Sequence, residues 1–204
     1  MSPARRWPQG PAWLGCVLLG GVLLGGVLLG GCGATARPPR VEDLSGALVA
    51  PTTVPAGKVH VLVFTSHECP IANAYAPTLR ALAQQWRDQA VNVFLVHCDP
   101  DLTAATARDH AAAYDLPGCI LLDPHHDLVH QLGIEKTPEA AVVTEFGLVY
   151  RGRIDDQWQA LGARTAAANQ HDLANAVAAT LKGQPAQPAR TPVVGCLLPT
   201  AKTR

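Results

Sequence analysis

The segment from residue 58 to residue 88 constrains the fold most, because a buried strand runs almost directly into a helix there. Residues 58–64 are mostly apolar and rich in β-branched side chains, which predicts a buried strand. Residues 71–88 carry an apolar or aromatic side chain at every third or fourth position, which predicts one amphipathic helix. Cys69 and Pro70 stand between the two. The N–H groups at a helix N-terminus favour a thiolate, so we expect Cys69 to be reactive; the alternative is a buried, inert thiol.

Strands and helices alternate along the middle of the chain. The patterns predict further strands at 91–96 and 119–122, helices at 103–114, 127–132 and 172–181, and a β-hairpin built from 140–143 and 148–151. This order indicates an α/β domain with a central mixed β-sheet flanked by helices. The expected organisation is a signal peptide (1–31), a tether (32–57), the folded domain (58–183) and a proline-rich tail (184–204).

Composition excludes two classes of protein. The chain has 16 basic and 16 acidic side chains, so its net charge is zero, and it lacks the basic surface that a nucleic-acid-binding protein needs. Hydrophobic residues make up 48% of the chain and charged residues 16%, which excludes an intrinsically disordered protein.

The N-terminus has the pattern of an export signal. Arg5 and Arg6 precede residues 12–31, which carry no charge. The run ends in Leu-Gly-Gly before Cys32, which resembles the bacterial lipoprotein lipobox and implies lipidation of Cys32. A retained membrane span and a plainly cleaved signal are the alternatives. If Cys32 is lipidated, we expect a protein anchored to a membrane of the cell envelope or periplasm. In each case we expect the body of the chain to lie outside the cytoplasm, where disulfides persist.

Two motifs and four stretches of the chain carry a resemblance to a known family. Cys69-Pro70 after a strand, and Pro77 further on, look like the active-site helix of the thioredoxin fold, and Thr137-Pro138 looks like its cis-proline loop. The matching stretches are 64–77, 137–143, 150–156 and 190–196. Together they resemble the redoxins of the alkyl hydroperoxide reductase / thiol-specific antioxidant family, in an envelope lipoprotein subgroup. The resemblance implies a thioredoxin-like fold in which Thr137 and Pro138 face the reactive cysteine.

The chain departs from the dithiol and copper-binding members of this fold. Ala72 stands where a Cys-x-x-Cys motif has its second cysteine, so no disulfide forms within the motif. Asn73 stands where the copper chaperones of this fold carry their second cysteine. A metal site built from His67, His97 and the adjacent cysteines is the less favoured alternative, because its spacing is not diagnostic.

The match to the peroxidase pattern is partial. Leu62 and Ser66 occupy the positions of its proline and threonine. Ser66 still offers a hydroxyl group, and protonated His67 would stabilise a thiolate at Cys69. Arg151 and Arg153 are candidates for the cation that peroxide reduction needs.

A reactive Cys69 needs a second group to resolve its oxidised form. Cys98 follows the second strand, and because the carboxyl ends of parallel strands share one edge, it is one candidate. Cys196, in the tail, is the other. Cys119 begins its strand and is expected in the core. The residues alone do not choose among the pairings. The resemblance favours Cys69–Cys196, because both cysteines lie in matching stretches.

The sequence therefore predicts an exported redoxin that uses Cys69 for thiol oxidation, thiol–disulfide exchange or peroxide reduction. Its partners would be a protein thiol or disulfide, or a peroxide, and it needs no metal and no cofactor. The alternative is a non-catalytic docking or accessory domain with Cys69 in a structural disulfide, and a copper-handling protein is a more distant one. The oligomeric state is not predicted.

Overall fold

The described part of the protein is residues 37–203 of a computed structural model. The expected signal peptide and the lipidation site Cys32 lie outside it. Within this part, no helix has the length and apolar character needed to cross a membrane.

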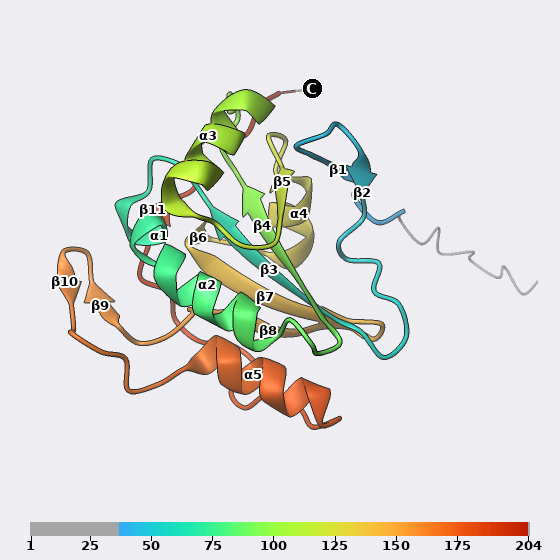
Figure 1. The fold of residues 1–204 in the computed structure, drawn as a ribbon, viewed down its shortest axis with the longest axis vertical. Coiled ribbons are helices and arrows are strands. Elements are labelled where there is room, and N and C mark those ends of the chain that lie inside the picture. The colour runs from blue at the N-terminus through green and yellow to red at the C-terminus, as the bar shows by residue number, and fades with distance from the viewer. Residues whose placement is uncertain (1–36, 204) are drawn as a thin grey trace, which may run out of the picture. The chain divides into compact units, whose positions relative to one another are not determined.

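Seven strands form the main sheet, in the order β2-β1-β5-β4-β3-β7-β8 (Figure 1). Strands β3, β4 and β5 are parallel to one another, whereas β7 is antiparallel to β3, and β1 to β5. The mixed sheet expected from the sequence is confirmed. The strands are β1 (Val41–Asp43), β2 (Leu48–Val49), β3 (Val59–Thr65), β4 (Val91–His97), β5 (Cys119–Leu122), β7 (Glu139–Thr144) and β8 (Gly147–Gly152).

Helices cover both faces of this sheet. Helices α1, α2 and α5 pack on one face, while α4 packs on the other (Figure 1). Helix α3 borders the first of these faces through Ala111. The helices are α1 (Pro70–Ala74), α2 (Ala76–Gln85), α3 (Ala104–Tyr114), α4 (Asp127–Leu132) and α5 (Asp172–Leu181).

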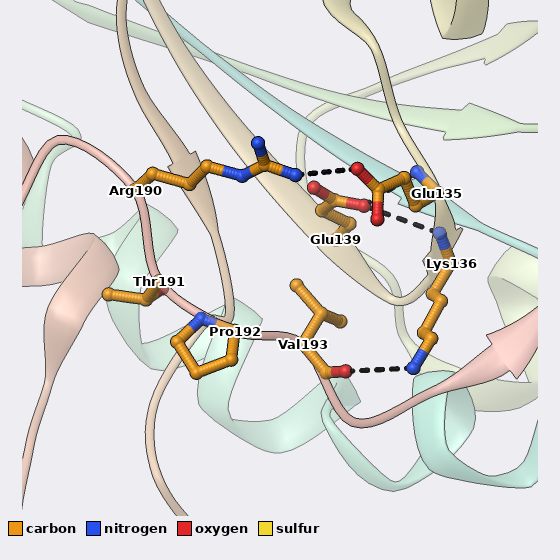
Figure 2. Close-up of a pocket in the computed structure, with 7 residues that line it drawn as sticks. All are labelled: Glu135, Lys136, Glu139, Arg190, Thr191, Pro192 and Val193. Carbon is orange, nitrogen blue, oxygen red and sulfur yellow. Dashed lines mark hydrogen bonds and ion pairs between the residues drawn. The ribbon is translucent and has the colours of Figure 1, made fainter.

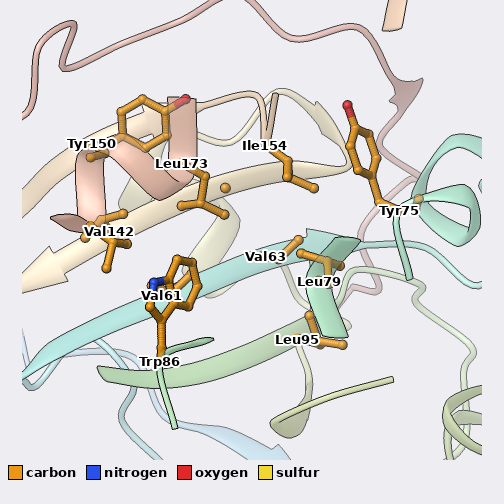
Figure 3. Packing of buried hydrophobic residues seen from close by; sticks show 14 of the residues in the cluster. Val61, Val63, Tyr75, Leu79, Trp86, Leu95, Val142, Tyr150, Ile154 and Leu173 are labelled. Atoms are coloured by element: carbon orange, nitrogen blue, oxygen red, sulfur yellow. The ribbon is translucent and has the colours of Figure 1, made fainter. Parts of the chain in front are cut away.

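Alternation along β3 divides the core into two clusters. Val61 and Val63 point into the first core cluster, beneath α1, α2 and α5 (Figure 3). Leu62 and Phe64 point into the second core cluster, on the side of α4. Both sides of β3 are buried, which is why residues 61–64 are apolar without interruption rather than alternating.

The helix predicted over 71–88 is two helices in the structure. The break falls at Tyr75, which ends α1 and precedes α2. Pro77 causes the break, because it has no N–H to donate to the carbonyl of Asn73 and its ring would crowd that carbonyl. In the first turn of α2 the same proline is tolerated, since an N–H there would have no helical partner.

Short strands add to the predicted elements. Strands β1 and β2 lie within the segment expected to be a tether, so the folded domain begins before residue 58. Two small ladders join β9 to β10 and β6 to β11. Strands of two or three residues are too short to show a periodic pattern. The strands of the two small ladders are β6 (Lys136–Thr137), β9 (Trp158–Ala160), β10 (Ala163–Arg164) and β11 (Cys196–Leu197).

Candidate active site

Cys69 is the N-cap of α1. Its backbone is extended, and Pro70 takes the first helical position. The Sγ atom accepts a hydrogen bond from the Ala72 amide at 3.5 Å and donates one to the Thr137 carbonyl at 3.2 Å. Only 2% of Cys69 is exposed. The thiol is therefore held between a helix N-terminus and the loop that carries Thr137.

Thr137 and Pro138 are joined by a cis peptide bond, as the resemblance implies. Thr137 also belongs to β6, where it lies directly opposite Cys196 of β11. Cys69 and Cys196 are thus both neighbours of Thr137. In the described residues both are free thiols, as are Cys98 and Cys119.

Cys196 holds its proton more tightly than an ordinary thiol. Burial raises its pKa to about 11, and the adjacent Cys69 adds to the rise, whereas the Ile71 amide opposes it. Its thiolate fraction at pH 7 is on the order of 10⁻⁴. Cys196 is therefore poorly suited to attack first and is a candidate for the second step.

Cys98 lies apart from this pair. It belongs to the second core cluster, whereas Cys69 belongs to the first, so the sheet separates them. Burial raises the pKa of Cys98 well above its ordinary value, and the carboxylates of Asp123 and Asp99 raise it further. The shared sheet edge that made Cys98 a candidate does not bring its side chain to Cys69.

Cys119 begins β5 and is partly exposed. Burial raises its pKa, and the charge of Asp43 adds to the effect. It packs against the second core cluster, away from Cys69, in keeping with a packing role.

Ser66 and His67 contact Asp99. The Ser66 hydroxyl donates to Asp99 at 2.5 Å, and the His67 amide donates to the same carboxylate at 3.0 Å. The His67 ring also lies 3.2 Å from it, measured from Nδ1 to Oδ1. Burial by itself would raise the pKa of Asp99, but hydrogen bonds from His97, Ser66 and His67 outweigh it and hold the pKa well below its ordinary value.

Asp99 is a site residue that the sequence analysis did not single out. Its carboxylate fixes the turn that leads into Cys69, because it binds two consecutive residues of that turn. Its position just after the end of β4 was the available signal, since polar residues at the carboxyl ends of parallel strands often reach a site.

Three histidines gather beside Asp99. His110 packs edge-on against His97, with ring centroids 5.1 Å apart, and less closely against His67. Burial lowers the pKa of His110 to about 4, with smaller contributions from His97 and His67. Among residues 37–203, no group of three or more His, Cys, Asp or Glu side chains is arranged to hold a metal ion.

The two arginines considered for peroxide chemistry bind carboxylates elsewhere. Arg153 Nε donates to Asp172 at 2.7 Å. Arg151 pairs with Glu139 and Glu135. Both guanidinium groups are thus committed to other partners.

Tyr75 joins the helix break to the loop after β8. Its hydroxyl donates to Asp155 at 2.6 Å, in a buried contact. Burial raises the pKa of Tyr75 well above its ordinary value, and the bond to Asp155 raises it further. This contact explains why residues 64–77 and 150–156, two of the stretches that carry the resemblance, are close in space.

Comparison with known proteins places this geometry in a family. The model described as AhpC/TSA family matches residues 33–155. None of the curated proteins matches the sequence. The resemblance found in the sequence is confirmed at the level of the redoxin family, and so is the thioredoxin-like α/β fold class.

Several solved structures are similar. An uncharacterized conserved protein from Geobacillus kaustophilus has 19% identity and a TM-score of 0.71, with 82% of this chain and 92% of that chain covered. A hypothetical protein from Sinorhizobium meliloti has 23% identity and a TM-score of 0.65, with 80% and 91% covered. A secreted Mycobacterium tuberculosis disulfide oxidoreductase homologous to E. coli DsbE has 23% identity and a TM-score of 0.47, with 54% and 78% covered.

Proposed function

The chain belongs to the AhpC/TSA family, and from that premise we propose that it is a thiol–disulfide oxidoreductase with Cys69 as its reactive residue and Cys196 as its resolving residue. One observation carries the proposal. Cys69 donates to the carbonyl of Thr137, and Cys196 lies opposite Thr137 in the β6–β11 ladder. The two thiols therefore meet beside the cis-proline.

The proposed reaction has two exchange steps. The thiolate of Cys69 attacks one sulfur of a partner's disulfide, which forms a mixed disulfide and releases the partner's other sulfur as a thiolate. Cys196 then loses its proton and attacks Cys69 Sγ, so that the partner leaves fully reduced. Two electrons pass to the partner, and the protein retains a Cys69–Cys196 disulfide. The reverse sequence oxidises a partner dithiol.

The site supports exchange with a protein more than reduction of a peroxide. Ser66 directs its hydroxyl to Asp99, and Arg153 binds Asp172. Arg151 pairs with Glu139, so all three groups considered for peroxide chemistry have other partners. A peroxide would oxidise Cys69 to a sulfenic acid, which Cys196 would then condense with, releasing water. We retain this reaction as the second activity to assay.

Thr137 and Pro138 are the proposed contact for the partner polypeptide. Strand β11 is an extended segment that already pairs with Lys136 and Thr137. Its presence supports the idea that this edge accepts an extended chain, because backbone pairing gives affinity without requiring a particular sequence.

A structural disulfide is the competing proposal, and the burial of Cys69 favours it. A bond between Cys69 and Cys196 would then staple the tail to the domain and never turn over. The reduction potential separates the two proposals, because structural disulfides typically lie below about −300 mV and exchanging ones lie above that value.

The test uses the full chain oxidised with glutathione disulfide and mapped by peptide analysis. We expect a Cys69–Cys196 disulfide, catalysed reduction of insulin in the presence of dithiothreitol, and loss of that activity in Cys69→Ser. A free Cys196 under oxidising conditions would contradict the proposal. Insulin reduction unchanged in Cys69→Ser would contradict it as well.

We also propose that the protein is exported and anchored to a membrane of the cell envelope through a lipid on Cys32. The uncharged run and the Leu-Gly-Gly-Cys sequence support this location. Radiolabelled palmitate should label the wild-type protein in cells and should not label Cys32→Ser. Labelling of the variant would overturn the anchor.

A further inference from the structure

We infer that Glu139 is a positioning residue for Cys69 and Cys196, and that it acts through Arg151. Its use in disulfide chemistry rests on the proposed function, whereas its effect on the backbone around Thr137 does not. Glu139 is the first residue of β7 and follows Pro138 directly.

The Glu139 carboxylate organises the segment before the cis-proline. Only 3% of the residue is exposed. Its Oε2 atom accepts hydrogen bonds from the amides of Glu135 at 2.8 Å and Lys136 at 3.3 Å. The side chain therefore closes a loop around Thr137 and Pro138, and this loop sets the direction of the carbonyl to which Cys69 donates.

Arg151 balances the buried carboxylate. Its Nε atom lies 3.3 Å from Glu139 Oε1. The guanidinium also donates to the carbonyls of Leu132 and Gly133 and binds Glu135 at 3.0 Å. A buried carboxylate without such a partner is costly, so the loop and the arginine stabilise each other.

The same arginine holds the tail through its backbone. The Arg151 amide donates to the Ala189 carbonyl at 3.0 Å, and the Thr191 amide donates to the Arg151 carbonyl at 3.1 Å. The Thr191 hydroxyl contacts Tyr150 at 2.7 Å and is buried. Five residues after Thr191 the tail reaches Cys196.

Arg151 thus joins the two segments that carry the thiol contacts. Its side chain reaches the loop of Thr137, and its backbone reaches the tail of Cys196.

Figure 2 shows Glu139, Glu135 and Lys136 facing Arg190 and Val193 across a pocket, whose volume is about 500 Å³. Lys136 Nζ donates to the Val193 carbonyl at 3.3 Å, and Arg190 binds Glu135. These outer contacts are more exposed, so Glu139 is the buried centre of the arrangement.

The test compares Glu139→Gln with Glu135→Gln in the full chain. Both substitutions remove a carboxylate that pairs with Arg151, but Glu135 is 62% exposed in its side chain. Each protein is equilibrated with reduced and oxidised glutathione, and the Cys69–Cys196 disulfide is quantified. This equilibrium gives the effective concentration of one thiol at the other. We expect Glu139→Gln to lower that effective concentration by about tenfold or more, and Glu135→Gln to change it less than about twofold.

Amide hydrogen exchange supplies a readout that does not depend on redox chemistry. In Glu139→Gln, the amides of residues 136–137 and 196–197 should exchange faster while those of β3 and β4 remain protected. Arg151→Lys keeps the charge but not the forked geometry, so it should give a smaller effect in the same residues and serves if Glu139→Gln does not fold.

Each outcome decides a different claim. Equal effects of Glu139→Gln and Glu135→Gln, or unchanged exchange at 136–137 and 196–197, would overturn the positioning role. Absence of any Cys69–Cys196 disulfide in the wild type would overturn the proposed function, and the exchange data would then judge Glu139 by themselves.

Discussion

Cys69 and Cys98 both follow the carboxyl end of a central parallel strand, yet the structure gives them opposite surroundings. Cys69 caps a helix and contacts the backbone of Ala72 and Thr137. Cys98 is fully buried, and its Sγ atom makes a long contact of 3.7 Å with the Val96 carbonyl. Proximity to one sheet edge is therefore not enough to make a thiol part of the site.

Asp99 and Asp123, which both act on the Cys98 thiol, differ in what they bind. Asp99 binds Ser66 and His67 in the turn before Cys69. Burial would raise its pKa, but the hydrogen bonds that it accepts hold the pKa below the ordinary value. Asp123 lies near Cys98, and burial raises its pKa although the amides of residues 127–129 bind it. The first carboxylate orders a turn at the site, and the second caps α4.

Side-chain parity along β4 explains the difference between the thiols. Leu95 points into the first core cluster, whereas Phe94 and Val96 point into the second. Cys98 continues the even-numbered series and so falls on the α4 side. Cys69 escapes this rule because it lies three residues beyond Ser66 and begins a helix.

Replacing Cys69 and Cys98 one at a time should give the largest difference in activity between two variants. Cys69→Ser should lower the rate of insulin disulfide reduction by about 10³-fold or more, because the attacking sulfur is lost. Cys98→Ala should leave that rate within about twofold and lower the free energy of unfolding by about 1 kcal/mol, since it removes one buried sulfur. Turnover assays and urea unfolding of the two variants check this. A comparable loss of activity in Cys98→Ala would contradict the separation of the two thiols.

The pH dependence of the second exchange step should identify the resolving thiol. The pKa of Cys196 is raised to about 11, mainly by burial. Thiolate is the attacking form, so the rate should rise about tenfold per pH unit and about 100-fold between pH 7 and pH 9. Reaction with a chromogenic aromatic disulfide measures the rate of this step. Attack by Cys69 releases the first aromatic thiol, and attack by Cys196 on the resulting mixed disulfide releases the second. The second release should vanish in Cys196→Ser and persist in Cys98→Ala; a rate that does not depend on pH would rule out Cys196.

Sequence pattern predicted several central elements well because a proline or glycine marks where each one ends, at Pro124, Gly133 and Gly183. The predicted strand at 119–122 and the helices at 127–132 and 172–181 have the bounds of β5, α4 and α5. The break at Tyr75 and the strands β1 and β2 were not predicted. Apolar spacing continues across Tyr75, and the short strands gain their stability from the neighbour with which they pair rather than from their own sequence.

The site was less predictable, because its contacts join distant segments. Cys69 was named from its position at a helix N-terminus, whereas Thr137 and the preference for Cys196 came from the resemblance. The bond between the two cysteines remains a prediction. Asp99 and Glu139 could not be assigned their roles, since each binds backbone amides whose positions depend on the folded loops. Sequence pattern reports which face a side chain takes more reliably than which amide it reaches.

Gly195 offers a test of the close approach between the tail and the cis-proline loop. A Cβ atom at this position would lie 2.4 Å from the Thr137 carbonyl oxygen, and this neighbour is backbone that cannot turn aside. Gly195→Ala should therefore displace β11 and lower the effective concentration of Cys69 and Cys196 by about tenfold. Equilibration with glutathione measures this effective concentration. Val193→Ala, which keeps the backbone unchanged, is the control. If both variants behave like the wild type, β11 does not set the spacing of the thiols.

Acid should destabilise the packing on the Cys69 side of the sheet before that on the Cys98 side. This is the smallest of the predicted effects. The pKa of His110 is lowered to about 4 by burial first and by His97 and His67 second. An unfolded histidine takes up its proton near pH 6.5, so between pH 6.5 and 4 the unfolded chain binds more protons and stability falls with falling pH.

The expected loss is about 1 kcal/mol, because His110 is partly exposed. Urea unfolding from pH 7 to pH 4.5 should show a flatter profile in His110→Gln than in the wild type. His130 is the matched control, since it is exposed on α4, and His130→Gln should keep the wild-type slope. Asp99 adds no slope in this window, because its pKa is lowered from 3.8 and its stabilising charge is lost only below about pH 4. Equal slopes in His110→Gln and the wild type would mean that the histidines beside Asp99 do not couple the Cys69 side of the sheet to pH.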